Sequence, residues 1–172
     1  LENAIEEFAL ADSHWSFLLR DAVRRGRRLR ASRALQLARW CGWAIPPDEK
    51  GRLYEALARV EFLHAASCIA DDIIDGDATR RGQPSFHYRN GLSGGILTLL
   101  RIVARVVDED ARANGRLAEV VRQTLVGEAH DTGVFRVESG FEPRRALDSV
   151  LAKTMPLFEY AHEQVARACL LP

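Results

Sequence analysis

The sequence predicts an all-α protein on two observations. Apolar residues recur at the helical spacing of three and four along most of the 172-residue chain, and no alternation of period two extends beyond a few residues. Hydrophobic residues make up 47% and charged residues 28%, a globular composition that argues against intrinsic disorder. At this length we expect residues 1–172 to form a single domain.

Glycines, prolines and polar clusters divide the pattern into helices. Pro46 and Pro47 end the second helix because proline cannot occupy a helix interior. The stretch 76–84 is polar and contains two glycines and a proline, so we expect a loop there. The expected helices cover residues 1–25 with a break near 12–13, 31–40, 48–75, 85–88, 96–113, 117–132 and 142–170.

Charge and cysteine content exclude several classes of function. The 24 basic and 24 acidic residues cancel, so no long-range field steers the chain to nucleic acid or to an anionic membrane. Eight arginines lie between Arg20 and Arg39 without an aromatic stacking platform, which favours a solvated face over nucleic-acid binding. The three cysteines form no CxxC pair, which favours a reducing compartment, and we expect the cytoplasm. The longest apolar stretch, 92–107, contains two arginines and is too short to span a bilayer.

An acidic cluster lies near the end of the helix expected over residues 48–75. At 100° per residue, His64, Cys68, Asp71 and Asp75 share one helix face, so two carboxylates one turn apart project the same way. Like charges at this spacing repel, and acids at a helix C-terminus oppose its dipole, at a cost of roughly 0.3–1 kcal/mol for each effect. A divalent cation reverses that cost, and ligands that are all oxygens favour Mg²⁺ over zinc.

Two arginines follow this cluster in a loop bounded by glycines. Arg80 and Arg81 lie five and six residues beyond Asp75. The guanidinium group is permanently charged and matches the geometry of phosphate oxygens. Metal-binding acids beside adjacent arginines indicate a diphosphate site, and a solvated acidic pair with loop salt bridges is the alternative interpretation.

The segment 61–84 resembles the first aspartate-rich region of the trans-isoprenyl diphosphate synthases, the polyprenyl synthetase family. Its pattern is roughly E-x-x-H-x-(A/S)-x-x-x-D-D-x-x-D, a short loop, R-R-G and a following Pro. The matching residues are Glu61, His64, Ala66, Asp71, Asp72, Asp75, Arg80, Arg81, Gly82 and Pro84. Residues 26–30, GRRLR, resemble the family's G-K-R-L-R element, and Lys153-Thr154 with Leu157-Phe158 resembles its K-T-x-x-L-F.

The resemblance implies a helical bundle of the isoprenoid synthase type and a Mg²⁺-dependent prenyltransferase. Members ionise an allylic diphosphate and add the cation to isopentenyl diphosphate, releasing pyrophosphate. Catalytic roles would fall to Asp71, Asp75, Arg80, Lys153 and Thr154, with Mg²⁺ bound by Asp71, Asp75 and a supporting Asp72. Arg80 and Lys153 would bind the allylic diphosphate, and Arg27, Arg28, His64 and Arg81 would bind isopentenyl diphosphate.

Three further observations refine this expectation. Pro156 lies inside the last helix and should bend it beside Lys153, freeing the carbonyl of Ala152, which together with the Thr154 hydroxyl could stabilise an allylic cation.

Glu128 and Asp131 follow Gly127 where the family often has a polar element, and could bind metal or form a supporting network. In this family the residues five and four before the first aspartate lie below the diphosphate. Here they are the small Ala66 and Ser67, so we expect a product of C20 or longer.

The chain departs from the family in its length. It has 172 residues, whereas family members are longer and carry a second aspartate-rich helix that completes the metal site. We therefore expect only part of the fold, and a homodimer or a heteromer. A non-catalytic subunit that modulates a complete partner and a class I terpene cyclase remain as alternatives. The retained acids and arginines favour an enzyme, and the RRG and GRRLR elements favour two diphosphates over one.

Overall fold

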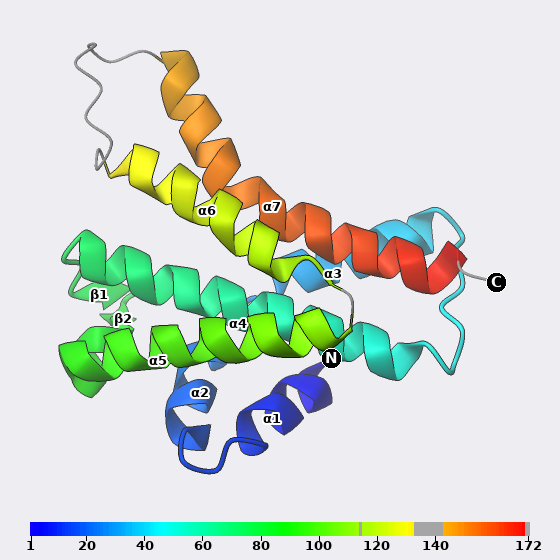
Figure 1. The fold of residues 1–172 in the computed structure, drawn as a ribbon, viewed down its shortest axis with the longest axis horizontal. Coiled ribbons are helices and arrows are strands. Elements are labelled where there is room, and N and C mark those ends of the chain that lie inside the picture. Colours follow the sequence, from blue (N-terminus) through cyan, green and yellow to red (C-terminus); the bar gives the residue numbers. More distant parts are fainter. Residues whose placement is uncertain (114, 133–142, 171–172) are drawn as a thin grey trace.

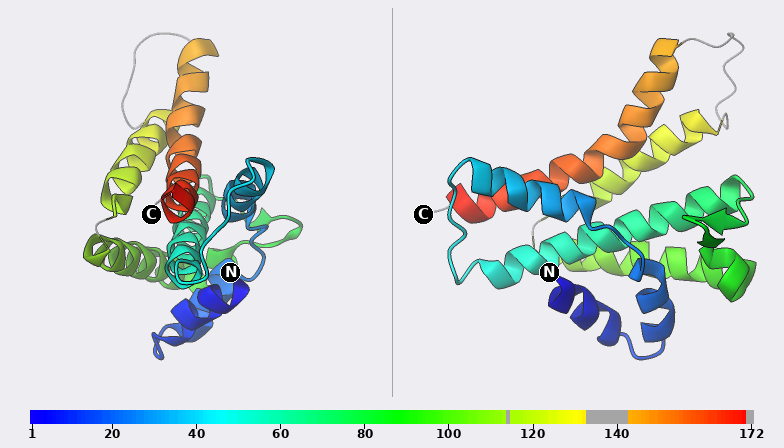
Figure 2. Two further views of the ribbon diagram at one scale, coloured as in Figure 1. Left: turned by 90° about the vertical axis from the view of Figure 1, so that its right-hand side faces the viewer. Right: turned by 180° about the vertical axis from the view of Figure 1, so that it is seen from behind.

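The all-α prediction is confirmed by the structure, a computed structural model that describes residues 1–113, 115–132 and 143–170. Helix α4 is central and contacts α1, α2, α3, α5 and α7, while α6 packs against α7 (Figure 1). Figure 2 shows that α3 lies on the side of α7 away from α6. Within these residues the elements are α1 (Glu2–Leu10), α2 (Ser16–Val23), α3 (Leu29–Trp40), α4 (Lys50–Ile74), β1 (Thr79–Arg80), β2 (Gln83–Pro84), α5 (Phe86–Arg112), α6 (Leu117–Asp131) and α7 (Pro143–Leu170).

Helix α4 takes the central place because its apolar residues lie on nearly every side. Leu57, Val60 and Phe62 are fully buried although they point in different directions around the helix. A helix with apolar residues on every side must be covered by other helices on every side, whereas an amphipathic helix is covered on one face only. The aspartates at the end of α4 are therefore carried by the most firmly held helix of the bundle.

The predicted break near residues 12–13 is confirmed as the turn between α1 and α2. The prediction of separate helices over 85–88 and 96–113 was wrong in its extent, because α5 is interrupted only at Gly91, where φ is 76° and ψ is 157°. Glycine at position 95, inside this helix, allows α5 to pass close to α4. A Cβ atom on Gly95 would lie 3.1 Å from the side chains of both His87 and Ile73.

The stretch predicted as a loop over 76–84 contains a short antiparallel hairpin. Thr79 pairs with Pro84 and Arg80 with Gln83 across a two-residue turn. Both turn residues, Arg81 and Gly82, have positive φ angles of 53° and 71°. Such turns match the natural twist of a hairpin, so Arg80 and Arg81 sit on a defined scaffold rather than on an irregular loop.

By length and composition alone, α5 could cross a membrane. It packs lengthwise against α4, however, and core helices of globular proteins pass the same test. This finding is therefore weak evidence for a membrane span.

A buried aspartate joins four helices at the end of the bundle away from the hairpin. Asp110 is 1% exposed and accepts hydrogen bonds from the Tyr160 hydroxyl of α7 and from the Leu117 amide at the start of α6, the latter at 2.8 Å. Its other neighbour is Arg59 of α4, with the Arg59 Nε atom 4.0 Å from the carboxylate. Burial and the Asp110 carboxylate both raise the pKa of Tyr160, so the phenol remains a donor.

Replacing Asp110 with alanine is expected to lower the free energy of unfolding by about 3 kcal/mol, because it leaves the buried Arg59 guanidinium without its counter-charge and the Tyr160 hydroxyl without its acceptor. Urea unfolding followed by circular dichroism measures this loss. Asp108→Ala is the matched control, since the Asp108 side chain is 60% exposed and pairs with Arg112 on the surface. Its expected cost is below about 1 kcal/mol. Equal losses for the two variants would contradict a structural role for Asp110.

Candidate functional site

Two cavities lie on opposite sides of α4 near its C-terminal half. The first, which we call the arginine-lined cavity, contains residues of α4, of the hairpin and of the corner between α2 and α3. The second, the apolar cavity, lies between α4, α5, α6 and one residue of α7. Helix α4 lines the arginine-lined cavity with Glu61, His64, Ala65, Cys68, Ile69 and Asp72, and the apolar cavity with Leu63, Ala66, Ser67, Ala70 and Asp71.

This division changes the interpretation of the predicted polar face of α4. His64, Cys68 and Asp71 do follow one stripe of the helix, but the stripe runs along the ridge between the cavities. His64 and Cys68 consequently line one cavity and Asp71 the other. The Cys68 sulfur lies 3.7 Å from His64 Nδ1, consistent with small, local packing.

The supporting role of Asp72 at the metal site remains a prediction, and in the structure Asp72 is paired with the hairpin. Its carboxylate is 2% exposed and accepts a hydrogen bond of 2.6 Å from Arg80 Nε. The same guanidinium has a nitrogen 3.7 Å from Asp71 Oδ2. Asp72 thus fixes the hairpin arginine against α4, and Arg80 reaches both aspartates from the arginine-lined cavity.

The other predicted arginines fall into different environments. Arg27 is exposed and does not line the arginine-lined cavity, whereas Arg28 and Arg81 do. The Arg28 guanidinium donates to the Val23 carbonyl at 2.8 Å and forms an ion pair with Glu2 at 3.2 Å. Arg28 is therefore at the cavity wall, but its charge is shared with α1.

His64 is neutral in the folded protein at neutral pH. Burial, followed by the nearby charges of Arg30, Arg81 and Arg80, lowers the pKa of His64 from 6.5 to about 3. It can offer a diphosphate one N–H hydrogen bond but no positive charge at neutral pH.

We expect the NMR signal of His64, assigned by its loss in His64→Gln, to show no titration between pH 8 and about pH 5. Because the folded pKa lies below the unfolded one, the unfolded chain binds this proton first. The contribution of His64 to stability is therefore complete above pH 6.5 and is lost progressively as the pH falls from 6.5 towards 3. A midpoint near 6.5 in the folded protein would contradict this assignment.

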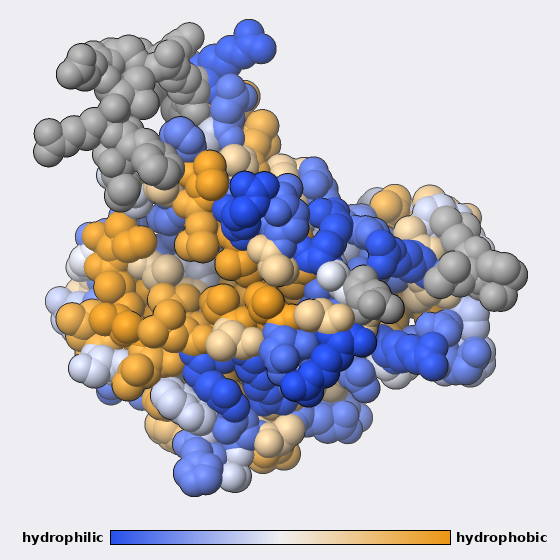
Figure 3. All heavy atoms as spheres, in the orientation of Figure 1, coloured by the Kyte–Doolittle hydropathy of each residue, from blue (hydrophilic) through white to orange (hydrophobic). Residues whose placement is uncertain are grey.

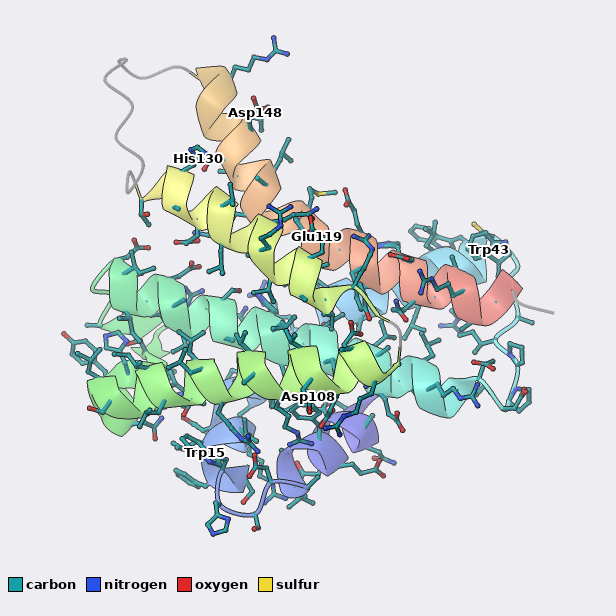
Figure 4. All side chains as sticks on the ribbon, viewed as in Figure 1. Trp15, Trp43, Asp108, Glu119, His130 and Asp148 are labelled. Carbon is teal, nitrogen blue, oxygen red and sulfur yellow. The ribbon has the colours of Figure 1, made fainter. Side chains whose placement is uncertain are left out.

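Lys153 lies among three carboxylates at the acidic end of the apolar cavity. Its Nζ atom is 3.1 Å from Asp71 Oδ1, 2.8 Å from Glu128 Oε2 and 3.2 Å from Asp131 Oδ2. Burial lowers the pKa of Lys153, but the ion pairs with these acids outweigh burial and raise it. The predicted polar element at the end of α6 is thus joined to the predicted lysine of α7 and to the first aspartate of α4. Figure 4 marks this end of α6 with His130 and the adjoining part of α7 with Asp148.

Close contact between α6 and α7 sets the position of Lys153. A Cβ atom on Gly127 would lie 2.5 Å from the Lys153 backbone nitrogen, and Ser149 donates to the Gly127 carbonyl at 3.1 Å. Figure 1 shows that α7 changes direction partway along its length, and Pro156 lies inside that helix. Thr154 follows the lysine and is half-buried, so its predicted role remains a prediction.

The predicted metal ligands are only partly assembled. Asp75 is the exposed C-cap of α4, one turn beyond Asp71. Within residues 1–113, 115–132 and 143–170, no group of three or more His, Cys, Asp or Glu side chains is arranged to hold a metal ion. Asp71 Oδ1 is nevertheless a buried oxygen to which no donor is aligned for a hydrogen bond, although Lys153 is within ion-pair distance. An oxygen of this kind suits a cation as its partner.

Sequence reasoning missed two residues of the arginine-rich side. The Arg30 Nε atom is buried without a hydrogen-bond partner, and its guanidinium lies over the Phe158 ring at 4.9 Å. Its charge also helps to lower the pKa of His64, although Arg30, like Arg27, does not line the arginine-lined cavity. Glu61 is 2% exposed and accepts from the Ala31 amide at 3.3 Å, which holds the start of α3 against α4. The sequence feature that could have identified Arg30 is its place as the third arginine of the GRRLR element, three residues after Arg27.

The helical bundle and the acidic and arginine-bearing elements around α4 define the class of the protein, that of the isoprenoid synthase fold. This class agrees with a solved structure, the geranylgeranyl pyrophosphate synthetase from the archaeon Geoglobus acetivorans. It has a TM-score of 0.73 and 24% identity, and the match covers 98% of this chain and 58% of that one. The chain belongs to the polyprenyl synthetase family, because the profile of that family matches residues 15–170.

Curated relatives agree with this family. The chain is 29% identical over 151 residues to the geranylgeranyl diphosphate synthase of Pantoea ananas, covering 80% of this chain and 49% of that protein. It is 31% identical over 144 residues to the hexaprenyl pyrophosphate synthase of Saccharolobus solfataricus, covering 76% of this chain and 47% of that protein. The chain thus spans about half the length of these relatives.

Proposed function

We propose that this chain forms part of a Mg²⁺-dependent prenyltransferase that condenses an allylic diphosphate with isopentenyl diphosphate. The observation that carries the proposal is a pair of cavities that flank the C-terminal half of α4 and are linked by Arg80, which lines one of them and has a guanidinium nitrogen 3.7 Å from Asp71 Oδ2 of the other. One is rich in arginine and suits a diphosphate. The other joins apolar walls to an acidic end, which suits a diphosphate with an apolar tail when a cation is present. A reaction between two diphosphates needs two such sites.

Asp71 and Asp75 are the residues that we propose to hold Mg²⁺. Both supply carboxylate oxygens from successive turns of α4, and Asp71 Oδ1 is the buried oxygen without an aligned donor. When bound, Mg²⁺ would neutralise the charge of the diphosphate leaving group. Glu128 and Asp131 would support Lys153 from α6, since both form ion pairs with it.

The basic residues would bind and orient the two substrates. Arg80 and Lys153 would contact the allylic diphosphate and stabilise the negative charge that develops on its leaving oxygen as the C–O bond breaks. Thr154 and the carbonyl of Ala152 would face the allylic cation. Pyrophosphate leaves as this cation forms, the allylic carbon then bonds to the alkene of isopentenyl diphosphate, and the resulting cation loses a proton to give the new double bond. Isopentenyl diphosphate would be bound by Arg28, Arg81 and neutral His64, together with Arg27 and Arg30.

We propose a product of C20 or longer. Ala66 and Ser67 lie in the wall of the apolar cavity below Asp71, and both are small. The Ser67 hydroxyl donates back to the His64 carbonyl at 2.9 Å, so Ser67 itself presents no unpaired donor towards the tail. The other walls at this level are mainly aliphatic side chains, including Leu99, Val103 and Val121.

Exposed apolar side chains support a homodimer or a heteromer. Figure 3 shows apolar surface gathered over α5 and the adjoining part of α6. Leu97 is 53% exposed, Leu100 58% and Leu125 62%, and a connected apolar surface of this kind is typical of an interface. The three cysteines are free, which is consistent with the cytoplasm that we propose as the location.

The alternatives predict different assays. The protein, expressed at its full natural length, should release pyrophosphate from farnesyl or geranyl diphosphate only when isopentenyl diphosphate and Mg²⁺ are both present, and yield a prenyl diphosphate of C20 or longer. Release without isopentenyl diphosphate would favour a terpene cyclase. Activity that appears only after a complete partner synthase is added would favour a modulating subunit. No turnover in any of these mixtures would exclude the proposal.

A further inference from the structure

We propose that the Asp21–Arg89 ion pair is a positioning device for the isopentenyl diphosphate site, an inference that rests on the function proposed above. The pair lies at the rim of the arginine-lined cavity and joins α2 to α5. Neither residue belongs to the motifs by which the sequence resembles its family. Their effect on the site is through the hairpin that carries Arg80 and Arg81.

Asp21 receives three hydrogen bonds on one carboxylate oxygen. Arg89 donates to Asp21 Oδ2 from Nη2 at 2.8 Å and from Nε at 3.2 Å, and Asn90 donates from Nδ2 at 2.9 Å. The Asp21 side chain is 13% exposed and the Arg89 side chain 27%. Charge-assisted bonds that are partly shielded from water are stronger than exposed surface pairs. The start of α5 is therefore held firmly against α2.

Arg89 also contacts the hairpin directly. Its remaining nitrogen, Nη1, donates to the carbonyl of Pro84, the last residue of β2. One guanidinium thus joins α2, β2 and α5. At the other end of the hairpin, Arg81 donates to the Arg25 carbonyl in the corner between α2 and α3. These two arginines fix the hairpin against the corner that carries Arg27 and Arg28.

The consequence is a fixed separation between the two groups of arginines around the cavity. Of the arginines proposed to bind isopentenyl diphosphate, Arg28 comes from the corner and Arg81 from the hairpin, so no single element sets their spacing. A diphosphate that bridges them requires this spacing before it binds, and errors of about 1 Å in such contacts can cost up to about 10²-fold. Arg89 orients these groups while its own charge is neutralised by Asp21.

Arg89→Lys and Asp21→Asn test the proposal in the protein at its full natural length. Lysine keeps the charge but cannot reach both Asp21 and Pro84, and asparagine keeps the shape of Asp21 but removes its charge. We expect each to raise KM for isopentenyl diphosphate about tenfold, because Arg81 is displaced. Both kcat and KM for farnesyl diphosphate should stay within twofold of wild type, because Arg80, which would contact the allylic diphosphate, is held separately by Asp72 on α4. Arg112→Lys, on a surface ion pair away from the cavity, is the control and should change nothing.

Each other outcome would overturn the proposal. A fall in KM for Asp21→Asn would show that Arg89, once released, binds the substrate itself. Unchanged KM values would show that the ion pair has no role in the site. A fall in kcat and melting temperature together with a rise in both KM values would show a purely structural role. If wild-type protein does not turn over, the proposed function fails instead. Hydrogen exchange of residues 79–85 then decides the positioning claim, because faster exchange in Arg89→Lys supports it and unchanged exchange excludes it.

Discussion

Replacing Asp71 with asparagine is expected to lower kcat/KM for the allylic diphosphate by more than about a hundredfold. Even residues that only support a metal ligand change affinity or activity by about 10- to 100-fold, and Asp71 is proposed as a ligand itself. The folded structure should tolerate the change, because Lys153 keeps its ion pairs with Glu128 and Asp131. Steady-state kinetics over a Mg²⁺ series and a thermal melt measure the two effects separately.

Asp77→Asn is the control for this experiment. Asp77 is exposed, carries the same charge and lies two residues beyond the aspartate motif. Its substitution should leave the kinetics unchanged. If Asp71→Asn instead lowered the melting temperature strongly and left the Mg²⁺ dependence of kcat/KM intact, Asp71 would be a structural residue.

Replacing Gly127 with alanine is expected to destabilise the fold and displace Lys153 at the same time. The added methyl carbon would lie 2.5 Å from the Lys153 nitrogen and 2.7 Å from the Ala152 carbonyl carbon, both backbone atoms that cannot rotate away. The helices α6 and α7 must separate, at a cost of about 1–3 kcal/mol. Urea unfolding should show this loss, and KM for the allylic diphosphate should rise.

Gly51→Ala provides the matched control for Gly127→Ala. Gly51 lies in the first turn of α4, and a Cβ atom there meets nothing within 4 Å. The same substitution should stabilise the protein by about 0.5 kcal/mol, since alanine loses less backbone entropy than glycine on folding. A Gly127→Ala protein as stable as wild type would show that α6 and α7 are not closely packed at Lys153.

Local patterns were sufficient to predict most of the helices. The apolar spacing between residues 117 and 132 predicts α6 to within a residue at its end, because Leu117 and Val120 recur at the helical spacing and are buried in the bundle. Part of the predicted set is also brought together, since Arg80 contacts Asp71 and Asp72 and Lys153 pairs with Asp71 across 82 positions of sequence (153 minus 71).

Features that depend on tertiary contacts could not be predicted in the same way. Helical geometry places His64 and Asp71 on one stripe, but which cavity each one lines depends on what packs beside α4. Arg81 adopts a positive φ that its residue type does not favour, so the hairpin was not expected. The start of α3 depends on Glu61, thirty residues away, and this contact places Arg30 beside His64.

The most direct test of the central claim is calorimetric titration of the protein, at its full natural length, with inorganic pyrophosphate in the presence and absence of Mg²⁺. We predict binding that requires Mg²⁺, disappears on chelation with EDTA and is lost in Asp71→Asn. Pyrophosphate that bound equally well with and without Mg²⁺, or equally well to wild type and Asp71→Asn, would contradict the claim that these acids serve a metal-bridged diphosphate.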